Sequence, residues 1–399
     1  MRRAGSIFVV VLATLVTLLT GATLYVEHAE WTGAIRTYDH DDPHPGPPFR
    51  LIRQTRLAGL GGYHVHPAVV SGGRARDFSA DIPPATRRIL VVGKSMVVGT
   101  PYVKYGSIPD WIGAELSLRF PELHFEVINL AEGGHQSSWA YEMAKAAYKV
   151  NADLLLVAFG GDDETLGLRP AWRQRLDSWN LARLADQTYR RQCRPNLFPR
   201  IEMSPEYTRQ FREIYEGQIA DLARRAASAP FPTIFATVPI NWKYDCHGGE
   251  SGVEFSAEAA HIRQQAEQAE AAGDGTKAKA LYRKLVETER CHRTRPSDND
   301  FIRSLTRSPR VSVIDWEAIV DAVGPAGMAD PTMFVDVSHM TWRAYALIGE
   351  ATAQFLIDQK LLGLADEPLP PPSVEDIRAK YGWTEFPVGE PWQGQGYEK

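Results

Sequence analysis

Short apolar runs alternate with segments of helical periodicity along the chain from residue 87 to residue 359. Five runs have the length and composition of buried strands: 88–92, 124–130, 153–159, 232–238 and 311–315. Apolar residues recur at helical spacing in three segments: 107–120, 137–150 and 341–359. Strands separated by helices predict right-handed crossovers and a mainly parallel sheet with helices on both faces. The pattern therefore predicts an α/β fold whose ligand site lies beyond the carboxyl ends of the strands.

The first thirty residues form a separate unit. Arg2 and Arg3 precede an uncharged apolar run from Ile7 to Val26. A run of about 20 residues can cross a bilayer as a helix, and the arginines before it favour a cytoplasmic N-terminus. The alternative is a cleaved signal peptide with a weak cleavage site at 20–22, but the apolar region of such peptides is normally shorter. We favour a retained membrane anchor over residues 1–30, and both interpretations place the bulk of the chain outside the cytoplasm, as in a periplasmic protein.

The rest of the chain divides into a lead-in, a main domain and a tail. Residues 31–86 are rich in His, Pro and Gly and are expected to form a stalk or lead-in. The main domain is predicted over 87–365, with helical insertions at 167–228 and 254–306. Residues 366–399 are a Pro-rich tail that we expect to be extended and weakly ordered.

The two insertions differ in composition. The first mixes Arg with Trp and Tyr directly after a strand, which fits either a lid over the substrate or a solvated helical pair. The second contains GDGTKAKALYRKL, residues 273–285, which is similar to the second half of a tetratricopeptide repeat, with Ala278 and Tyr282 four apart. A solenoid needs several such repeats, so this single hairpin is expected to pack on the main domain, where it could also bind a protein partner.

The net charge and the spacing of the cysteines argue against two classes of function, nucleic-acid binding and zinc binding. The chain of 399 residues has a net charge of −5, which gives no footprint for nucleic acid. Cys193, Cys246 and Cys291 lack the close pairs of a zinc site and are expected to be buried thiols, although an exported compartment permits one disulfide. His64 and His66 have no further ligand at suitable spacing and are expected on the surface or in packing. We predict neither a metal nor a cofactor.

The stretch RRILVVGKSMVVGTPY, residues 87–102, admits two interpretations. Gly93, Lys94 and Ser95 match the end of a phosphate-binding loop, but Arg88 occupies the position of its first glycine. The nucleotide interpretation fails on that missing glycine. The second interpretation is a serine exposed by a sharp turn at the end of a strand, which Gly93 permits.

A serine becomes a useful nucleophile when an imidazole takes its proton and a carboxylate orients the imidazole. Asp336 and His339 lie three residues apart before the last predicted helix, so a turn would place both side chains on one side. Glycines at two strand ends, 133–134 and 160–161, could present donors to a developing oxyanion. Each signal is weak alone, but they occur in order at the ends of successive strands.

That set of blocks resembles the SGNH, or GDSL-like, hydrolases. The resemblance covers 87–165 and 310–355 and rests on four blocks: GKS, the glycines after Asn129, GGDDE and DVSH. The hairpin insertion and the run TVPINWKYD are similar to a membrane-anchored bacterial branch of the family. The resemblance implies a flavodoxin-like three-layer α/β sandwich with a mainly parallel sheet and helical insertions.

The resemblance also assigns roles to individual residues. It implies that Ser95 is the nucleophile, His339 the general base and Asp336 the group that orients His339. The backbone N–H groups of Ser95 and Gly134 would form two parts of the oxyanion hole, and the family's third donor, an asparagine, falls on Asp162. The implied chemistry is that of a serine esterase.

The aspartate at position 162 departs from the family pattern. An ionised carboxylate cannot donate a hydrogen bond, and loss of one such donor costs on the order of 10² to 10³ in rate. Two rescues are open: Asp162 is protonated beside Asp163, or Lys94 compensates an ionised Asp162. Lys94 and Asp163 are therefore candidate modulators of the site.

Two functions remain open from the sequence. The first is an exported, membrane-anchored serine esterase or O-acyltransferase that acts on ester-linked acyl groups, such as those of small molecules, glycans or lipids. The second is a catalytically inactive binding or assembly protein of the cell envelope that keeps the fold, which suits the altered donor and the helical insertions. We favour the enzyme because Ser95, Asp336 and His339 are all present.

Overall fold

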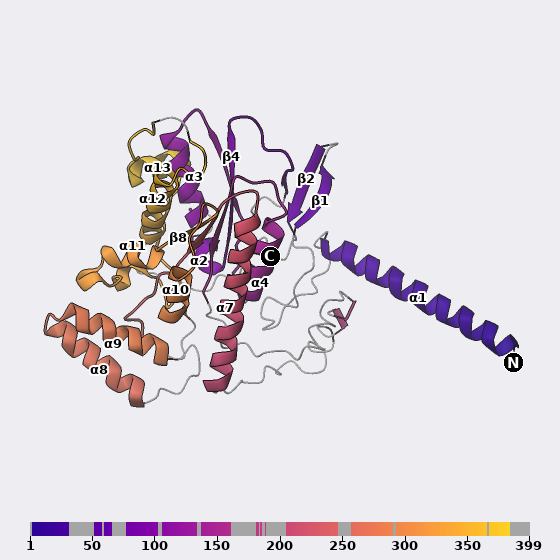
Figure 1. Cartoon of the computed structure of the whole chain (residues 1–399), viewed down its shortest axis with the longest axis horizontal. Coiled ribbons are helices and arrows are strands. Elements are labelled where there is room, and N and C mark those ends of the chain that lie inside the picture. The colour runs from indigo at the N-terminus through magenta and orange to yellow at the C-terminus, as the bar shows by residue number, and fades with distance from the viewer. Residues whose placement is uncertain are drawn as a thin grey trace.

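A sheet of five parallel strands forms the centre of the molecule (Figure 1). The computed structural model describes residues 2–31, 52–57, 60–65, 77–102, 106–133, 137–160, 205–245, 257–289, 293–364 and 367–383, with a few positions between 181 and 188. The strands are β4 (Thr86–Gly93), β5 (His124–Asn129), β6 (Leu154–Ala158), β7 (Thr233–Ala236) and β8 (Val311–Ile314).

The order of these strands identifies the fold. They lie side by side as β5-β4-β6-β7-β8, and each neighbouring pair is parallel. Numbered along the chain from β4, this is the order 2-1-3-4-5, which is the flavodoxin-like arrangement. All five strands coincide with apolar runs of the sequence, and the predicted flavodoxin-like α/β fold is confirmed.

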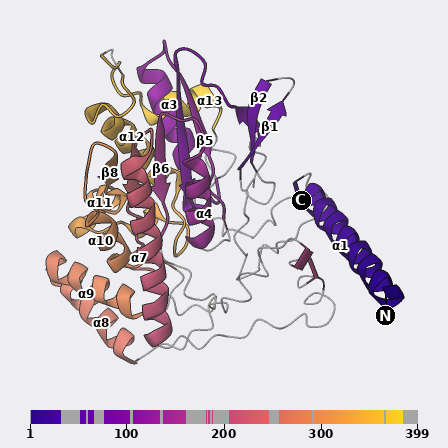
Figure 2. The same ribbon diagram turned by 45° about the vertical axis from the view of Figure 1, so that its right-hand side comes forward.

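Alternate residues of β4 face opposite layers, because successive side chains of a strand point to opposite faces. Ile89 and Val91 belong to one hydrophobic core and Leu90 and Val92 to another. The first core is shared with helices α3 (Ile108–Arg119), α11 (Trp316–Ala322) and α12 (Trp342–Asp358). The second is shared with helices α4 (Ser137–Ala147) and α7 (Pro205–Ser228). Helices therefore cover both faces of the sheet, as Figures 1 and 2 show.

The insertion between β7 and β8 forms a helical hairpin followed by a third helix. Its helices are α8 (Ala257–Ala271), α9 (Gly275–Thr288) and α10 (Pro296–Arg303). Asp274 caps α9 by accepting a hydrogen bond from the backbone N–H of Lys277. Ala278 and Tyr282 are buried and belong to the same core as α3 and α12, so the hairpin packs on the main domain.

Residues of the lead-in form structure that the sequence pattern did not predict. Strands β1 (Ile52–Leu57), β2 (Leu60–Val65) and β3 (Asp77–Ser79) make a small antiparallel sheet. Val65 and Phe78 are buried in the core that contains Leu90. This sheet therefore packs on the main domain at the positions of these two side chains.

The expected extended tail contains helix α13 (Val374–Tyr381), so that expectation is wrong for this segment. Ser373 accepts a hydrogen bond from the backbone N–H of Asp376, and the Asp376 carboxylate accepts one from the N–H of Ser373. Such a capping box starts a helix. Ile377 is fully buried, and the ring of Trp383 packs 4.9 Å from that of Trp111. Apolar burial therefore anchors a segment whose proline content suggested an open chain.

The N-terminal apolar run lies on helix α1 (Arg2–Trp31), which projects away from the sheet in both views (Figures 1 and 2). In the part of the chain that the structure describes, no helix has the length and apolar character required to cross a bilayer. The membrane anchor predicted for residues 1–30 is not confirmed.

Candidate active site

Ser95 stands beyond the carboxyl end of β4, an interior strand of the sheet, directly after a sharp turn. Strand β4 ends at Gly93, Lys94 is extended, and Ser95 begins the short helix α2 (Ser95–Val98). A Cβ on Gly93 would lie 2.4 Å from a methyl group of Val97 and 2.6 Å from the carbonyl oxygen of Ala158. The turn can fold back on itself only because position 93 has no side chain. This geometry brings the hydroxyl of Ser95 to the edge of the sheet.

Asn129, at the end of the neighbouring strand β5, holds the backbone around this turn. Its side-chain oxygen accepts a hydrogen bond from the N–H of Ala131 at 3.1 Å. Its amide nitrogen donates to the Ser107 hydroxyl at 3.2 Å and to the carbonyl of Val97 at 3.4 Å. Asn129 thereby connects the end of β5 to helix α2, which carries Ser95.

His339 and Asp336 lie on the turn 334–340, which precedes helix α12 and which we call the triad turn. Nε2 of His339 is 2.8 Å from Oγ of Ser95, and Nδ1 of His339 is 2.6 Å from Oδ2 of Asp336. Oδ1 of Asp336 accepts from the backbone N–H groups of Ser338 and His339 at 2.8 and 2.7 Å. The structure thus brings Ser95 into contact with His339, which is 244 positions away in the sequence, and places Asp336 beside His339.

The environment of Asp336 keeps its carboxylate ionised. Burial raises the pKa of this group, but the hydrogen bond and charge of His339 and the two backbone N–H donors outweigh burial, so the pKa of Asp336 is lowered below its usual value. An ionised Asp336 accepts a hydrogen bond from the N–H group at Nδ1 of His339. Nε2 then carries the lone pair, which can accept the proton of Ser95.

Part of the predicted oxyanion hole lies outside the described residues. Gly134, Asp162 and Asp163 fall there, so the charge compensation predicted between Lys94 and Asp162 stays a prediction. Lys94 itself is only 9% exposed. Gly160 precedes the undescribed segment, and a Cβ on it would lie 2.0 Å from the Thr294 hydroxyl, so this strand end accepts only glycine without rearrangement.

The metal and cysteine predictions concern residues that the structure describes only in part. His64 contacts Asp77 at 2.6 Å between strands β2 and β3, whereas His66 and the three cysteines lie outside the described residues. Among the described residues, no group of three or more His, Cys, Asp or Glu side chains is arranged to hold a metal ion.

Sequence reasoning missed a residue that contacts the triad turn. Asn241 follows strand β7, and its amide nitrogen donates to the backbone carbonyl of Asp336 at 2.9 Å. Asn241 lies in the run TVPIN, which the sequence analysis used only as part of the family resemblance. The two residues are 95 positions apart, so no local spacing connects them.

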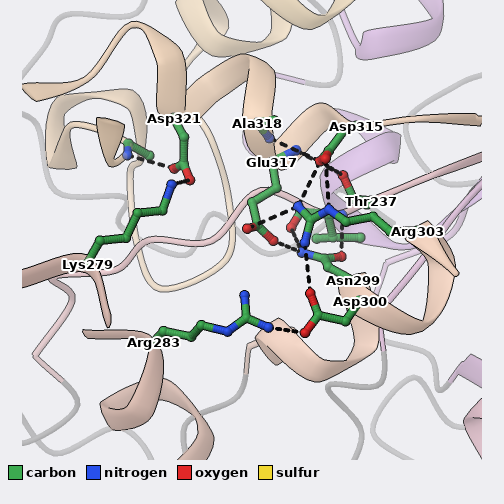
Figure 3. Close-up of polar contacts among 12 residues, drawn as sticks. Thr237, Lys279, Arg283, Asn299, Asp300, Arg303, Asp315, Glu317, Ala318 and Asp321 are labelled. Carbon is green, nitrogen blue, oxygen red and sulfur yellow. Dashed lines mark hydrogen bonds and ion pairs between the residues drawn. The ribbon is translucent and has the colours of Figure 1, made fainter. Parts of the chain in front are cut away.

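A second cluster of charged residues lies at the carboxyl ends of β7 and β8 (Figure 3). Arg303 donates from Nε and Nη2 to the two carboxylate oxygens of Asp315, both at 2.8 Å, and lies 3.1 Å from Glu317. Thr237 donates to Asp315 at 2.8 Å, and Asn299 donates to Glu317. Burial raises the pKa of Glu317, whereas hydrogen bonds from Arg303 and Thr237 outweigh burial and lower that of Asp315. We call these five residues the Arg303 cluster.

Comparison with known proteins finds only distant structural likenesses. No family model matches the chain, and no curated protein matches it. Among solved structures, a lipase/acylhydrolase from Enterococcus faecalis is 13% identical, covering 72% of this chain and 100% of that one, with a TM-score of 0.31. A GDSL-like lipase from Bacteroides thetaiotaomicron is 12% identical, covering 70% and 92%, with a TM-score of 0.33. The solved structure of TesA is 13% identical, covering 68% of this chain and 99% of that one, also with a TM-score of 0.33.

These identities and TM-scores are low, so the assignment of the fold rests on the strand order of the chain itself. The chain has the fold expected of an SGNH/GDSL-like hydrolase. The 2-1-3-4-5 sheet carries Ser95 after its first parallel strand and His339 before its last long helix, in the order that the sequence blocks predicted.

Proposed function

We propose that this chain is an SGNH/GDSL-like serine hydrolase that cleaves ester bonds through Ser95, His339 and Asp336. The observation that carries the proposal is the continuous chain of contacts, 2.8 Å from Ser95 Oγ to His339 Nε2 and 2.6 Å from His339 Nδ1 to Asp336. Both distances are within hydrogen-bonding range, and the first allows Ser95 to pass its proton to His339.

The proposed reaction has two steps. In the first, Ser95 gives its proton to Nε2 of His339 as Oγ attacks the acyl carbon, and His339 then passes this proton to the departing alcohol. An acyl group remains bound to Ser95. In the second step, His339 takes a proton from water, the resulting oxygen nucleophile releases the acid, and Ser95 recovers its proton. Asp336 holds the ring and stabilises its positive charge throughout.

The nature of the acceptor decides between two activities. Water as the acceptor makes the enzyme an esterase, whereas a sugar hydroxyl makes it an O-acyltransferase. Ester-linked acyl groups of glycans or lipids would suit a chain held outside the cytoplasm, as predicted from residues 1–30. The backbone N–H groups of Ser95 and Gly134 are the proposed oxyanion donors, with Lys94 and Asp163 adjusting the charge at Asp162.

A covalent probe tests the proposal directly. The full chain would be treated with a fluorophosphonate and assayed on short p-nitrophenyl esters across pH, next to Ser95→Ala and the matched control Ser304→Ala, which alters an exposed serine after helix α10. We expect labelling and hydrolysis in wild type and in the control, and neither in Ser95→Ala. Wild-type chain that is folded but neither labelled nor active at any pH would overturn the proposal and favour a binding or assembly protein.

A further inference from the structure

The segment that follows strand β7 lies between the triad turn and the helical hairpin. We call residues 237–244 the β7 loop. Asn241 is 5% exposed, and its amide nitrogen donates to the carbonyl of Asp336, the residue whose carboxylate orients His339. The opposite orientation of the amide would place two oxygens face to face, so donation to Asp336 fixes the orientation. The side chain of Asn241 therefore holds the backbone of the triad turn through one buried hydrogen bond.

The hairpin fixes Asn241 through a buried arginine. Nη1 of Arg293 donates to the backbone carbonyl of Asn241 at 2.6 Å, and Nη2 of Arg293 pairs with Glu289 at the end of α9. Glu289 also pairs with Arg263 of α8 at 2.8 Å. Burial lowers the pKa of Arg293 to about 10, with Glu289 opposing this shift, so the guanidinium remains charged at neutral pH.

Further contacts tie the neighbouring residues of the loop to the same insertion. Nε1 of Trp242 donates to Asp321 at 2.8 Å, and Lys279 of α9 pairs with the other oxygen of Asp321 at 2.8 Å, as Figure 3 shows for the lysine. Arg263 donates to the carbonyl of Tyr244 at 2.9 Å. The loop is thus held at positions 241 and 244 by Arg293 and Arg263, and at position 242 by Asp321 of α11, which also pairs with Lys279 of α9.

We propose that Asn241 is a positioning residue for the triad, and that the α8–α9 hairpin sets the place of Asn241 through Arg293. This inference rests on the proposed hydrolase function. A shift in the Asp336 backbone moves the carboxylate that orients His339, and a misplacement of about 1 Å at such a site can reduce the rate 10²-fold. The hairpin in this arrangement acts as an internal support of the catalytic geometry.

Two substitutions test the proposal in the full chain. Asn241→Ala removes the donor to Asp336, and we expect kcat on p-nitrophenyl acetate to fall roughly 10- to 100-fold while KM stays within about twofold. Arg293→Lys keeps a charge for Glu289 but loses the fork that reaches both partners, so we expect a smaller fall of about fivefold. The matched control is Arg283→Gln, which removes an ion pair between α9 and Asp300 on the outside of the same hairpin and should not change kcat.

A double-mutant cycle separates positioning from general stability. In an Asp336→Ala background, Asn241→Ala should lower the residual rate by less than about twofold, because the group that it positions is already gone. Equal losses in both backgrounds would indicate a merely structural role and would overturn the proposal. Should Asn241→Ala fail to fold, the same cycle run with Arg293→Lys decides the question in the same way.

An NMR measurement keeps this inference distinct from the proposed function. The proton on Nδ1 of His339, hydrogen-bonded to Asp336, should give a resolved signal that weakens or broadens in Asn241→Ala and persists in Arg283→Gln. If wild type is inactive but this pattern appears, the hydrolase proposal fails and the positioning role stands. If wild type is active and Asn241→Ala keeps its kcat and its signal, the positioning role fails and the hydrolase proposal stands.

Discussion

The triad and the Arg303 cluster are two groups of charged residues at the same edge of the same sheet, and they differ in how completely their polar atoms are used. In the Arg303 cluster, the guanidinium meets two carboxylates, and Thr237 and Asn299 donate to the same carboxylates. In the triad, a single line of contacts ends at the hydroxyl of Ser95. Exposure does not separate the two groups: the side chain of His339 is 20% exposed, whereas those of Arg303, Asp315 and Glu317 are 29%, 36% and 5% exposed.

This difference teaches how to distinguish a reactive site from a structural one. Short contacts and shifted pKa values occur in both groups, so neither feature alone identifies chemistry. In the Arg303 cluster the hydroxyl of Thr237 donates to a carboxylate that is already paired with Arg303. The hydroxyl of Ser95 instead lies beside an imidazole that can take its proton, and this is why we place the reaction at Ser95.

The largest expected effect is the loss of activity when a substitution removes the base of the triad and leaves the fold intact. His339→Ala removes the base, so we expect kcat to fall on the order of 10⁴-fold or more, while the free energy of unfolding changes by less than about 1 kcal/mol. Steady-state hydrolysis of p-nitrophenyl acetate and urea unfolding measure the two quantities. A variant that kept a tenth of wild-type activity would remove His339 from the mechanism.

A substitution in the Arg303 cluster is expected to reduce stability and to leave kcat nearly unchanged. Arg303→Met leaves Asp315 and Glu317 without their cation, and we expect the free energy of unfolding to fall by about 3 kcal/mol with kcat of the folded protein within about threefold of wild type. Urea unfolding checks the loss against Arg209→Ala, which breaks an exposed pair with Glu213 on α7 and should change stability by less than about 0.5 kcal/mol. Equal effects of the two substitutions would show that the Arg303 cluster stabilises the fold no more than an exposed ion pair does.

The smallest expected effect is a pH dependence of the free energy of unfolding that arises from the ionisation of Asp336. The pKa of Asp336 is lower in the folded chain than in the unfolded one, so its ionisation stabilises the fold above about pH 4, and this contribution is lost as pH falls through the lowered pKa. Asp336→Asn should therefore reduce the free energy of unfolding more at pH 7 than at pH 3, which urea unfolding at the two pH values measures. A difference that grows toward acid pH would contradict the sign of this shift.

Much of the fold could be predicted because its signals are local. The strands β4 and β6 are buried on both faces, and such strands are visible as uninterrupted apolar runs. Helix α13 was missed because its prolines precede the capping box rather than interrupt the helix. The small antiparallel sheet was missed because β1 is mostly polar between its two ends and β2 contains two adjacent glycines, so neither strand is visible as an apolar run.

The site was predictable only where resemblance supplied the connection. Ser95 and His339 were paired by the order of family blocks, since no physical signal in the sequence links positions 244 apart. Asn241 was missed because its partner is a backbone carbonyl, which leaves no mark on residue type. Arg303 and Asp315 resemble ordinary surface charges in the sequence, and only the packing of α10 against the ends of β7 and β8 shows otherwise.

The placement of the triad turn after the hairpin insertion has a consequence for the order of events during synthesis. A ribosome completes strand β4 and its serine long before it reaches the histidine, and the folded insertion is made in between. A nascent or truncated polypeptide thus carries a hydroxyl with no base beside it. If the proposed triad carries the reaction, acyl chemistry can begin only after the triad turn has packed beside Ser95.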